Sequence, residues 1–225
     1  MNDIGASIEA QTSTSDKFAA YGATAFLVSG VVAALSTVFL LLTFASQAST
    51  MLEPVAEMTP LDRTANGLMG LAVIVAIPVA FRFHRSWRTR AARASRGALA
   101  VGVVSLLVNG LLLLVLATGL FNWDVDVLTI VPFGGIGLWI FLVSAGQADP
   151  ALRGLLRWTG LAIGVGYMLL VIAFYGGGGP AAVSDPKTVF DSPLLLVGAM
   201  VSLLASQIGY PVWAIGLGRR LRAGG

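Results

Sequence analysis

The sequence predicts an all-α fold: a polytopic membrane protein with six transmembrane helices in one domain, residues 1–225, and both termini in the cytoplasm. Hydrophobic residues make up 56% of the chain and charged residues only 11%, a balance too apolar for an ordinary soluble domain. Six stretches without any Asp, Glu, Lys, Arg or His approach the roughly 20 helical residues that cross a membrane core. The basic residues are concentrated on one side of the predicted bundle, which sets its orientation.

The predicted spans follow a short polar tail, residues 1–21. The first seventeen residues of this tail hold three acids and one lysine, unlike the basic start of a secretory signal, so we expect an uncleaved first span. The six spans are residues 22–45, 64–81, 97–121, 127–145, 158–175 and 193–217.

Three of the spans are preceded by a capping residue followed by proline. Thr59, Pro60 and Asp62 combine an N-cap, a proline at the first helical position and an acid in the first turn, so the second helix should begin near Pro60. Asp149-Pro150 and Ser192-Pro193 repeat the arrangement before the fifth and sixth spans. We therefore expect these helices to extend beyond the apolar stretches.

Lys and Arg in short loops decide which side of a membrane protein faces the cytoplasm. Twelve of the fourteen Lys and Arg residues lie on the side that holds both termini, and only Arg63 and Lys187 lie on the other. The connections 46–59 and 176–192, the second glycine-rich, are thus predicted to be outside, and the basic connection 82–96 inside. We expect a multi-pass protein of the bacterial inner, or plasma, membrane.

The basic connection is predicted to lie against the headgroups of the inner leaflet. Each basic residue near an anionic surface contributes about 1 kcal/mol of attraction, which makes anionic lipids the expected partner. A specific lipid or an acidic protein partner is the alternative, whereas nucleic acid is not expected because the loop is too short to form a binding domain. The predicted lipid contacts are Arg82, Arg85, Arg88, Arg90, Arg93 and Arg96.

Several chemistries are excluded by the residue types that the sequence lacks. The chain has no cysteine and one histidine, too few ligands for a zinc or iron–sulfur site. The predicted spans contain no ionisable residue for a proton relay or a catalytic base. We therefore expect neither an enzyme nor a bound cofactor or metal.

Small and polar residues recur on one face of the third and sixth spans. At a spacing of three or four residues they favour helix packing, because small side chains let backbones approach and Ser or Asn bonds across helices. We expect Asn109 to pack in this way against the fifth or sixth span, near Gly164 or Ser206. The alternative is a polar cleft for a neutral or lipid-like ligand. The candidate residues are Ser105, Asn109, Trp139, Ser206, Gln207 and Tyr210.

Proline is expected to bend two spans. Pro78 and Pro211 each remove a main-chain hydrogen bond, and each is followed by valine, aromatic residues and arginines, in IPVAFRFHR and YPVWAIGLGRR. The segments DPALRGLLRWTGLAIGVGYMLL and SQIGYPVWAIGLGRRLR resemble the last two helices of a group of uncharacterised bacterial integral-membrane proteins. In that group a proline–aromatic element precedes a basic C-terminal tail, and the resemblance implies a multi-pass helical fold without an assigned activity.

These observations favour a non-catalytic accessory subunit or scaffold that acts through helix and lipid contacts, with a protein partner or a second copy of the chain. The alternative is a small transporter or channel for an uncharged or lipid-like solute. A water-accessible cavity that reaches Asn109 and Gln207 would favour the transporter.

Overall fold

A computed structural model of the chain describes residues 2–47, 58–120, 124–179 and 192–223. It confirms the predicted fold class, because the described residues form helices and turns and include six helices long and apolar enough to span a membrane. The helices are α1 (Asn2–Gln47), α2 (Pro60–Val75), α3 (Ile77–Trp87), α4 (Ala92–Ala117), α5 (Asp124–Ala145), α6 (Leu155–Gly176), α9 (Pro193–Leu204), the π-helical turn η1 (Ala205–Gly209) and α10 (Tyr210–Ala223). Most of the connections 46–59 and 176–192 lies outside the described residues.

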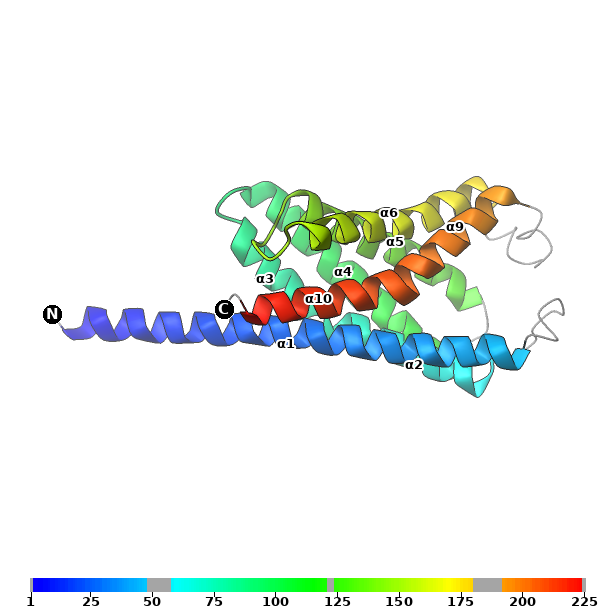
Figure 1. Cartoon of the computed structure of the whole chain (residues 1–225), viewed down its shortest axis with the longest axis horizontal. Coiled ribbons are helices and arrows are strands. Elements are labelled where there is room, and N and C mark those ends of the chain that lie inside the picture. Colours follow the sequence, from blue (N-terminus) through cyan, green and yellow to red (C-terminus); the bar gives the residue numbers. More distant parts are fainter. Residues whose placement is uncertain (1, 48–57, 121–123, 180–191, 224–225) are drawn as a thin grey trace.

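The spans form a ring in which each one packs against the next along the chain. The α2–α3 and α9–α10 pairs each make up one span, and contacts between α1 and α10 close the ring. The predicted N-terminal tail is helical and continuous with the first span, so α1 has 46 residues and projects beyond the other helices (Figure 1). At 1.5 Å per residue its length is about 69 Å.

Two of the three predicted helix starts are confirmed. Thr59 Oγ1 accepts a hydrogen bond from the N–H of Asp62 at 3.2 Å, and the Thr59 N–H donates to the Asp62 carboxylate at 3.0 Å. Ser192 accepts a 3.4 Å bond from the N–H of Leu195 ahead of α9. The start predicted at Asp149-Pro150 is wrong, because α6 begins at Leu155, after Gly154 with φ 59°. Asp149 instead caps a separate turn by accepting from the N–H of Ala151 at 2.9 Å.

The predicted basic loop 82–96 is largely helical, which corrects its boundaries. Residues 82–87 belong to α3 and residues 92–96 to α4, leaving a turn at 88–91. Arginine is a good helix former, so basic residues continue the helices instead of ending them. Side chains then tie the two helices together: His84 Nδ1 lies 2.7 Å from Ser95 Oγ, which also donates to the His84 carbonyl at 3.1 Å.

The expected breaks in the second and sixth spans are both present. The second span is interrupted at Ala76, two residues before Pro78. In the sixth span η1 precedes Pro211, which has no N–H to offer to the carbonyl of Gln207 four residues earlier. Thr37 of α1 donates its hydroxyl to that carbonyl over 2.8 Å. The sixth span therefore bends, so that α10 runs along α1 while α9 packs mainly against α6 (Figure 1).

Candidate functional site

The candidate site is a cavity of ≈ 320 Å³ lined by residues from all six spans. It lies towards the helix ends at Gln47, Pro60, Ala117, Gly176 and Pro193, which we call the cavity half of the bundle. The other half, which contains the turns 88–91 and 146–154 and the end of α10, is called the arginine half. The polar residues that line the cavity are Ser36, Asn66, Asn109, Thr129, Ser202, Ser206 and Gln207.

The bend of the sixth span explains why a cavity forms in this half. Beyond η1, α9 leans towards α6, and the space between α9 and α1 is bordered by Leu40 on one helix and Ala199 and Leu203 on the other. The π-helical turn itself contributes Ser206 and Gln207 to the lining. Single π-helical turns of this kind are frequent at functional sites.

Asn109 of α4 is the central polar residue of the site. Its side chain is 0% exposed, and neither Nδ2 nor Oδ1 has a hydrogen-bond partner among the residues that the structure describes. A buried amide left unbonded costs about 1–3 kcal/mol, so a partner supplied from the cavity would be stabilising. The expectation that Asn109 packs against the fifth or sixth span near Gly164 or Ser206 stays a prediction: the residue is buried and Ser206 lines the same cavity, but its amide makes no hydrogen bond among the described residues.

Two hydroxyl groups of the cavity lining donate their protons to the main chain. Ser36 Oγ donates to the Ala65 carbonyl at 2.8 Å, and Ser206 Oγ donates to the Leu203 carbonyl at 3.1 Å. Both oxygens retain lone pairs that can accept a further bond. The described residues that line the cavity include no ionisable side chain. The lining is thus chemically suited to a neutral molecule with both apolar and polar parts.

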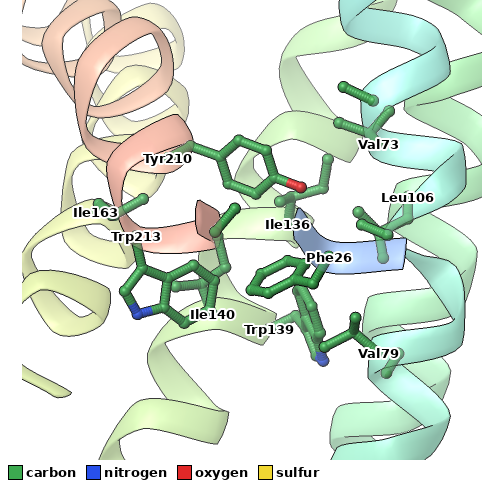
Figure 2. Packing of buried hydrophobic residues seen from close by; sticks show 14 of the residues in the cluster. Phe26, Val73, Val79, Leu106, Ile136, Trp139, Ile140, Ile163, Tyr210 and Trp213 are labelled. Carbon is green, nitrogen blue, oxygen red and sulfur yellow. The ribbon is translucent and has the colours of Figure 1, made fainter. Parts of the chain in front are cut away.

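A close-packed aromatic layer lies between the cavity and the arginine end. It consists of Phe26, Phe83, Trp139, Tyr210 and Trp213, all at most 1% exposed. Four spans contribute residues to both the aromatic layer and the cavity lining. On each of them the layer residue lies nearer the arginine end than the cavity residues do. Figure 2 shows these rings, other than Phe83, among aliphatic side chains from neighbouring helices.

Edge-to-face contacts and hydrogen bonds fix the rings of this layer. Phe26 meets Trp213 edge-on with centroids 5.2 Å apart, and Tyr210 at 6.2 Å. The Tyr210 hydroxyl lies 2.7 Å from Ser29 Oγ, and Trp213 Nε1 donates to the Leu156 carbonyl at 2.9 Å. Aromatic pairs in such geometry are favourable by about 0.5–1.5 kcal/mol beyond their burial. The layer is therefore an ordered barrier across the bundle.

The arginine half contains a buried ion pair. Arg82 Nε lies 3.5 Å from Asp149 Oδ2, and the two side chains are only 15% and 7% exposed. Ser86 Oγ donates to the same carboxylate oxygen at 3.2 Å. With Arg220 these residues line a second cavity, of ≈ 370 Å³. The pair joins α3 to the turn between α5 and α6.

Further arginines bond to main-chain carbonyls in this half. Arg90 Nη2 donates to the main-chain carbonyl of Gln147 at 2.8 Å, and Arg220 Nη1 donates to the main-chain carbonyl of Arg153 at 3.0 Å. Arg82 thus differs from the other predicted lipid contacts, because its side chain is largely buried against Asp149. The exposed members of that set are Arg85, Arg88, Arg90, Arg93 and Arg96.

The structure brings half of the predicted polar residues together. Asn109, Ser206 and Gln207 line the cavity. Tyr210 and Trp139 belong to the aromatic layer, and Ser105 packs against Gly135 of α5.

Sequence reasoning missed several polar residues of the cavity, among them Ser36 of α1. One signal was available, because Ser29, Ser36 and Thr43 recur every seven residues and so lie on one helix face. All three are at most 2% exposed.

Comparisons of the chain with protein-family models, with curated proteins and with solved structures find no match.

Proposed function

We propose that this six-helix membrane protein binds an uncharged small molecule in the cavity and carries it across the membrane. The observation behind this proposal is the fully buried carboxamide of Asn109, a residue of the cavity lining, whose two polar atoms are unbonded among the described residues. A purely structural asparagine would be expected to bond a neighbouring helix. The absence of ionisable groups from the described lining supports an uncharged ligand.

Transport, in preference to static binding, is supported by the contrast between the two sides of the cavity. Towards the arginine end the aromatic layer and the arginine contacts block a path through the bundle. Both the second and the sixth spans are interrupted near mid-bundle, as is common in transporters whose broken helices border the substrate site. A carrier needs a second state in which the layer parts, and these interruptions are the natural bending points.

A scaffold, which the sequence favoured, draws less support from the packing. The small residues on which that expectation rested are occupied within the chain: Gly102 lies against Trp139, and Gly164 against Gly137 and Phe141. These residues therefore serve the fold of this chain and offer no separate surface to a partner subunit.

The arginine half is proposed to face the cytoplasm of a bacterial cell, with the plasma membrane as its location. The excess of Lys and Arg on that side supports this orientation. Because the chain has no cysteine, single cysteines at positions 90 and 184 report the topology directly. We expect an impermeant thiol reagent, added to intact cells, to label position 184 and to spare position 90. Labelling of position 90 alone would reverse the orientation.

Anionic lipids of the inner leaflet are proposed to associate with Arg85, Arg88, Arg90 and Arg93, whose side chains are exposed. Replacing these four residues by glutamine should reduce the anionic lipid that remains bound in native mass spectra. Replacing the exposed Arg219 and Arg222 serves as a control for total charge near the same end. Equal lipid retention in all three proteins would argue against the proposal.

The cavity itself is tested with cysteine reporters on α9. Ala199 lines the cavity, whereas Val197 on the same helix is 58% exposed on the outer surface of the bundle. If the cavity admits water, the Ala199→Cys variant should react with a small methanethiosulfonate reagent much faster than Val197→Cys, because thiolates do not form in hydrocarbon. Equally slow reaction at both positions would contradict the proposed cavity.

Movement of solute is tested in proteoliposomes by osmotic swelling in glycerol, acetamide and δ-valerolactam. We expect at least one of these neutral solutes to enter faster than in protein-free vesicles. Asn109→Leu should remove the added permeability, and Leu107→Ala, on the exposed face of α4, should retain it. Permeability equal to that of protein-free vesicles for all three solutes would count against transport.

A further inference from the structure

We propose that the ligand of this cavity carries an amide group and that Asn109 recognises it through two parallel hydrogen bonds. The inference rests on the proposed function and adds the chemical class of the ligand. Its basis is that Asn109 belongs to the cavity lining and that both polar atoms of its carboxamide are buried and unbonded within the described part of the chain.

A carboxamide edge presents one donor and one acceptor side by side. Its complement is a planar edge with an adjacent acceptor and donor, which is what an amide or a lactam presents. The same complementarity lets asparagine bind adenine through two hydrogen bonds. A ketone or an ether pairs with Nδ2 alone and leaves Oδ1 buried and unbonded. Asn109 therefore discriminates in favour of ligands with both groups.

The other groups around the cavity fit the same class. The Ser36 and Ser206 hydroxyls have donated to main-chain carbonyls, so they present lone pairs that can accept a second N–H of a primary amide. Met69, Leu113 and Phe133 supply apolar contacts for the remainder of the ligand. A rigid amide also loses little rotational freedom on binding, in contrast to a flexible polyol.

The size of the cavity limits the ligand to a small molecule. A volume of ≈ 320 Å³ lies at the lower end of ligand pockets, which span about 300–1,000 Å³. It corresponds to about ten waters at roughly 30 Å³ each. A single ring that carries an amide fits within this volume.

A set of six-membered rings of nearly equal size tests the inference. δ-Valerolactam has the adjacent donor and acceptor, N-methyl-δ-valerolactam and cyclohexanone have only the acceptor, and cis-cyclohexane-1,2-diol has two hydroxyls. Protection of the Ala199→Cys thiol from a small methanethiosulfonate reagent reports occupancy of the cavity in the purified full-length chain. Leu203→Cys, also on the lining, is a second reporter in case the first variant fails to fold.

We expect δ-valerolactam to protect the thiol at roughly ten-fold lower concentration than either acceptor-only ring, the effect of losing one buried hydrogen bond. In the Asn109→Leu background this preference should disappear, so that the lactam and the ketone protect equally. Leu107→Ala, on the exposed face of the same helix and outside the lining, should preserve the preference.

The outcomes separate this inference from the proposed function. A reactive thiol that all the rings protect equally, or that the diol protects best, would leave a neutral-ligand cavity but overturn amide recognition. A thiol that reacts but is protected by none of the rings would also overturn it. An unreactive thiol at both reporter positions would remove the cavity and, with it, the proposed function.

Discussion

The two halves of the helix bundle are packed very differently, although four of the spans contribute residues to both the aromatic layer and the cavity. In the arginine half the aromatic layer fills the space between spans, and the buried carboxylate of Asp149 is paired with Arg82. In the cavity half the same spans leave ≈ 320 Å³ unfilled and the Asn109 amide unbonded among the described residues. The bend between α9 and α10, which belong to one span, places the two halves of that span against different neighbours, α6 and α1.

The contrast also shows when an unpaired polar atom indicates a site. Trp139 Nε1 and Ser144 Oγ are buried without hydrogen-bond partners among the described residues, as Asn109 is. Neither residue lines either of the two cavities described above. An unbonded atom enclosed by packed side chains only lowers stability, whereas one beside a cavity of ligand size can be satisfied from outside the chain.

The largest expected effect concerns the ion pair of the arginine half. Asp149→Leu should lower the free energy of unfolding by about 3 kcal/mol, because it leaves the Arg82 guanidinium largely buried without its carboxylate. The double variant Arg82→Leu, Asp149→Leu should recover much of this loss, since both charges of the pair are then removed. Unfolding in mixed detergent micelles, followed by circular dichroism, measures both. A double variant as unstable as the sum of the single ones would show that the two side chains act independently.

Adding one or two methyl groups distinguishes close packing from open space, with a smaller expected effect on the free energy of unfolding. A Cβ at Gly102 would lie 2.5 Å from the Trp139 ring, so Gly102→Ala should destabilise the arginine half by about 2 kcal/mol. Ala199→Val adds its methyl groups at the cavity and should change stability by less than about 0.5 kcal/mol. Gly97→Ala is the matched control, because nothing lies within 4 Å of its new Cβ and alanine favours the helix. The same unfolding assay applies; equal losses in Gly102→Ala and Ala199→Val would remove the distinction between the halves.

Loss of a single hydrogen bond in the aromatic layer should have a modest effect. Tyr210→Phe removes the 2.7 Å contact with Ser29 but keeps the ring that packs on Phe26. Hydrogen bonds between membrane spans contribute about 0.6 kcal/mol on average, so we expect a loss of that order. Ser29→Ala should give a similar value, and the double variant little more. Strict additivity of the two losses would mean that the hydroxyl groups do not interact.

The smallest effect on stability is expected at Asn109. Asn109→Leu replaces an unbonded amide with an apolar side chain of similar size, so the free energy of unfolding should stay within about 0.5 kcal/mol of the parent or rise. The preference of the cavity for the lactam over the ketone, measured by protection of the Ala199→Cys thiol, should nevertheless be lost. A destabilisation above about 1 kcal/mol would indicate that Asn109 does hold helices together.

The elements that sequence could predict are those determined by local chemistry. The six apolar stretches, the Thr59 and Ser192 caps and the breaks near Pro78 and Pro211 each depend on residues within one or two turns. Asp149 illustrates the limit of this reasoning. As Asp-Pro it has the pattern of a helix cap, yet its carboxylate pairs with Arg82, 67 positions earlier in the chain.

The cavity could be predicted only in part, for a similar reason. The spacing of Asn109, Ser206 and Gln207 places them on inward faces, but whether two such faces touch depends on the direction in which the sixth span bends. That direction is set by contacts of α9 with α6 and of Thr37 with Gln207, which no local pattern encodes. Ser36 was missed because α1 was interpreted only as an apolar span.

The hydrogen bond from Thr37 to the Gln207 carbonyl also bears on how the protein is assembled in the membrane. Pro211 has no N–H to donate to this carbonyl, and a carbonyl left without a hydrogen bond in hydrocarbon costs free energy. The donor belongs to the first span and the acceptor to the sixth, so the bond forms only after both helices have been inserted and have met. The sixth span should therefore acquire its final shape late, when the ring closes on α1. Chains truncated before residue 193 would contain five inserted helices but no cavity.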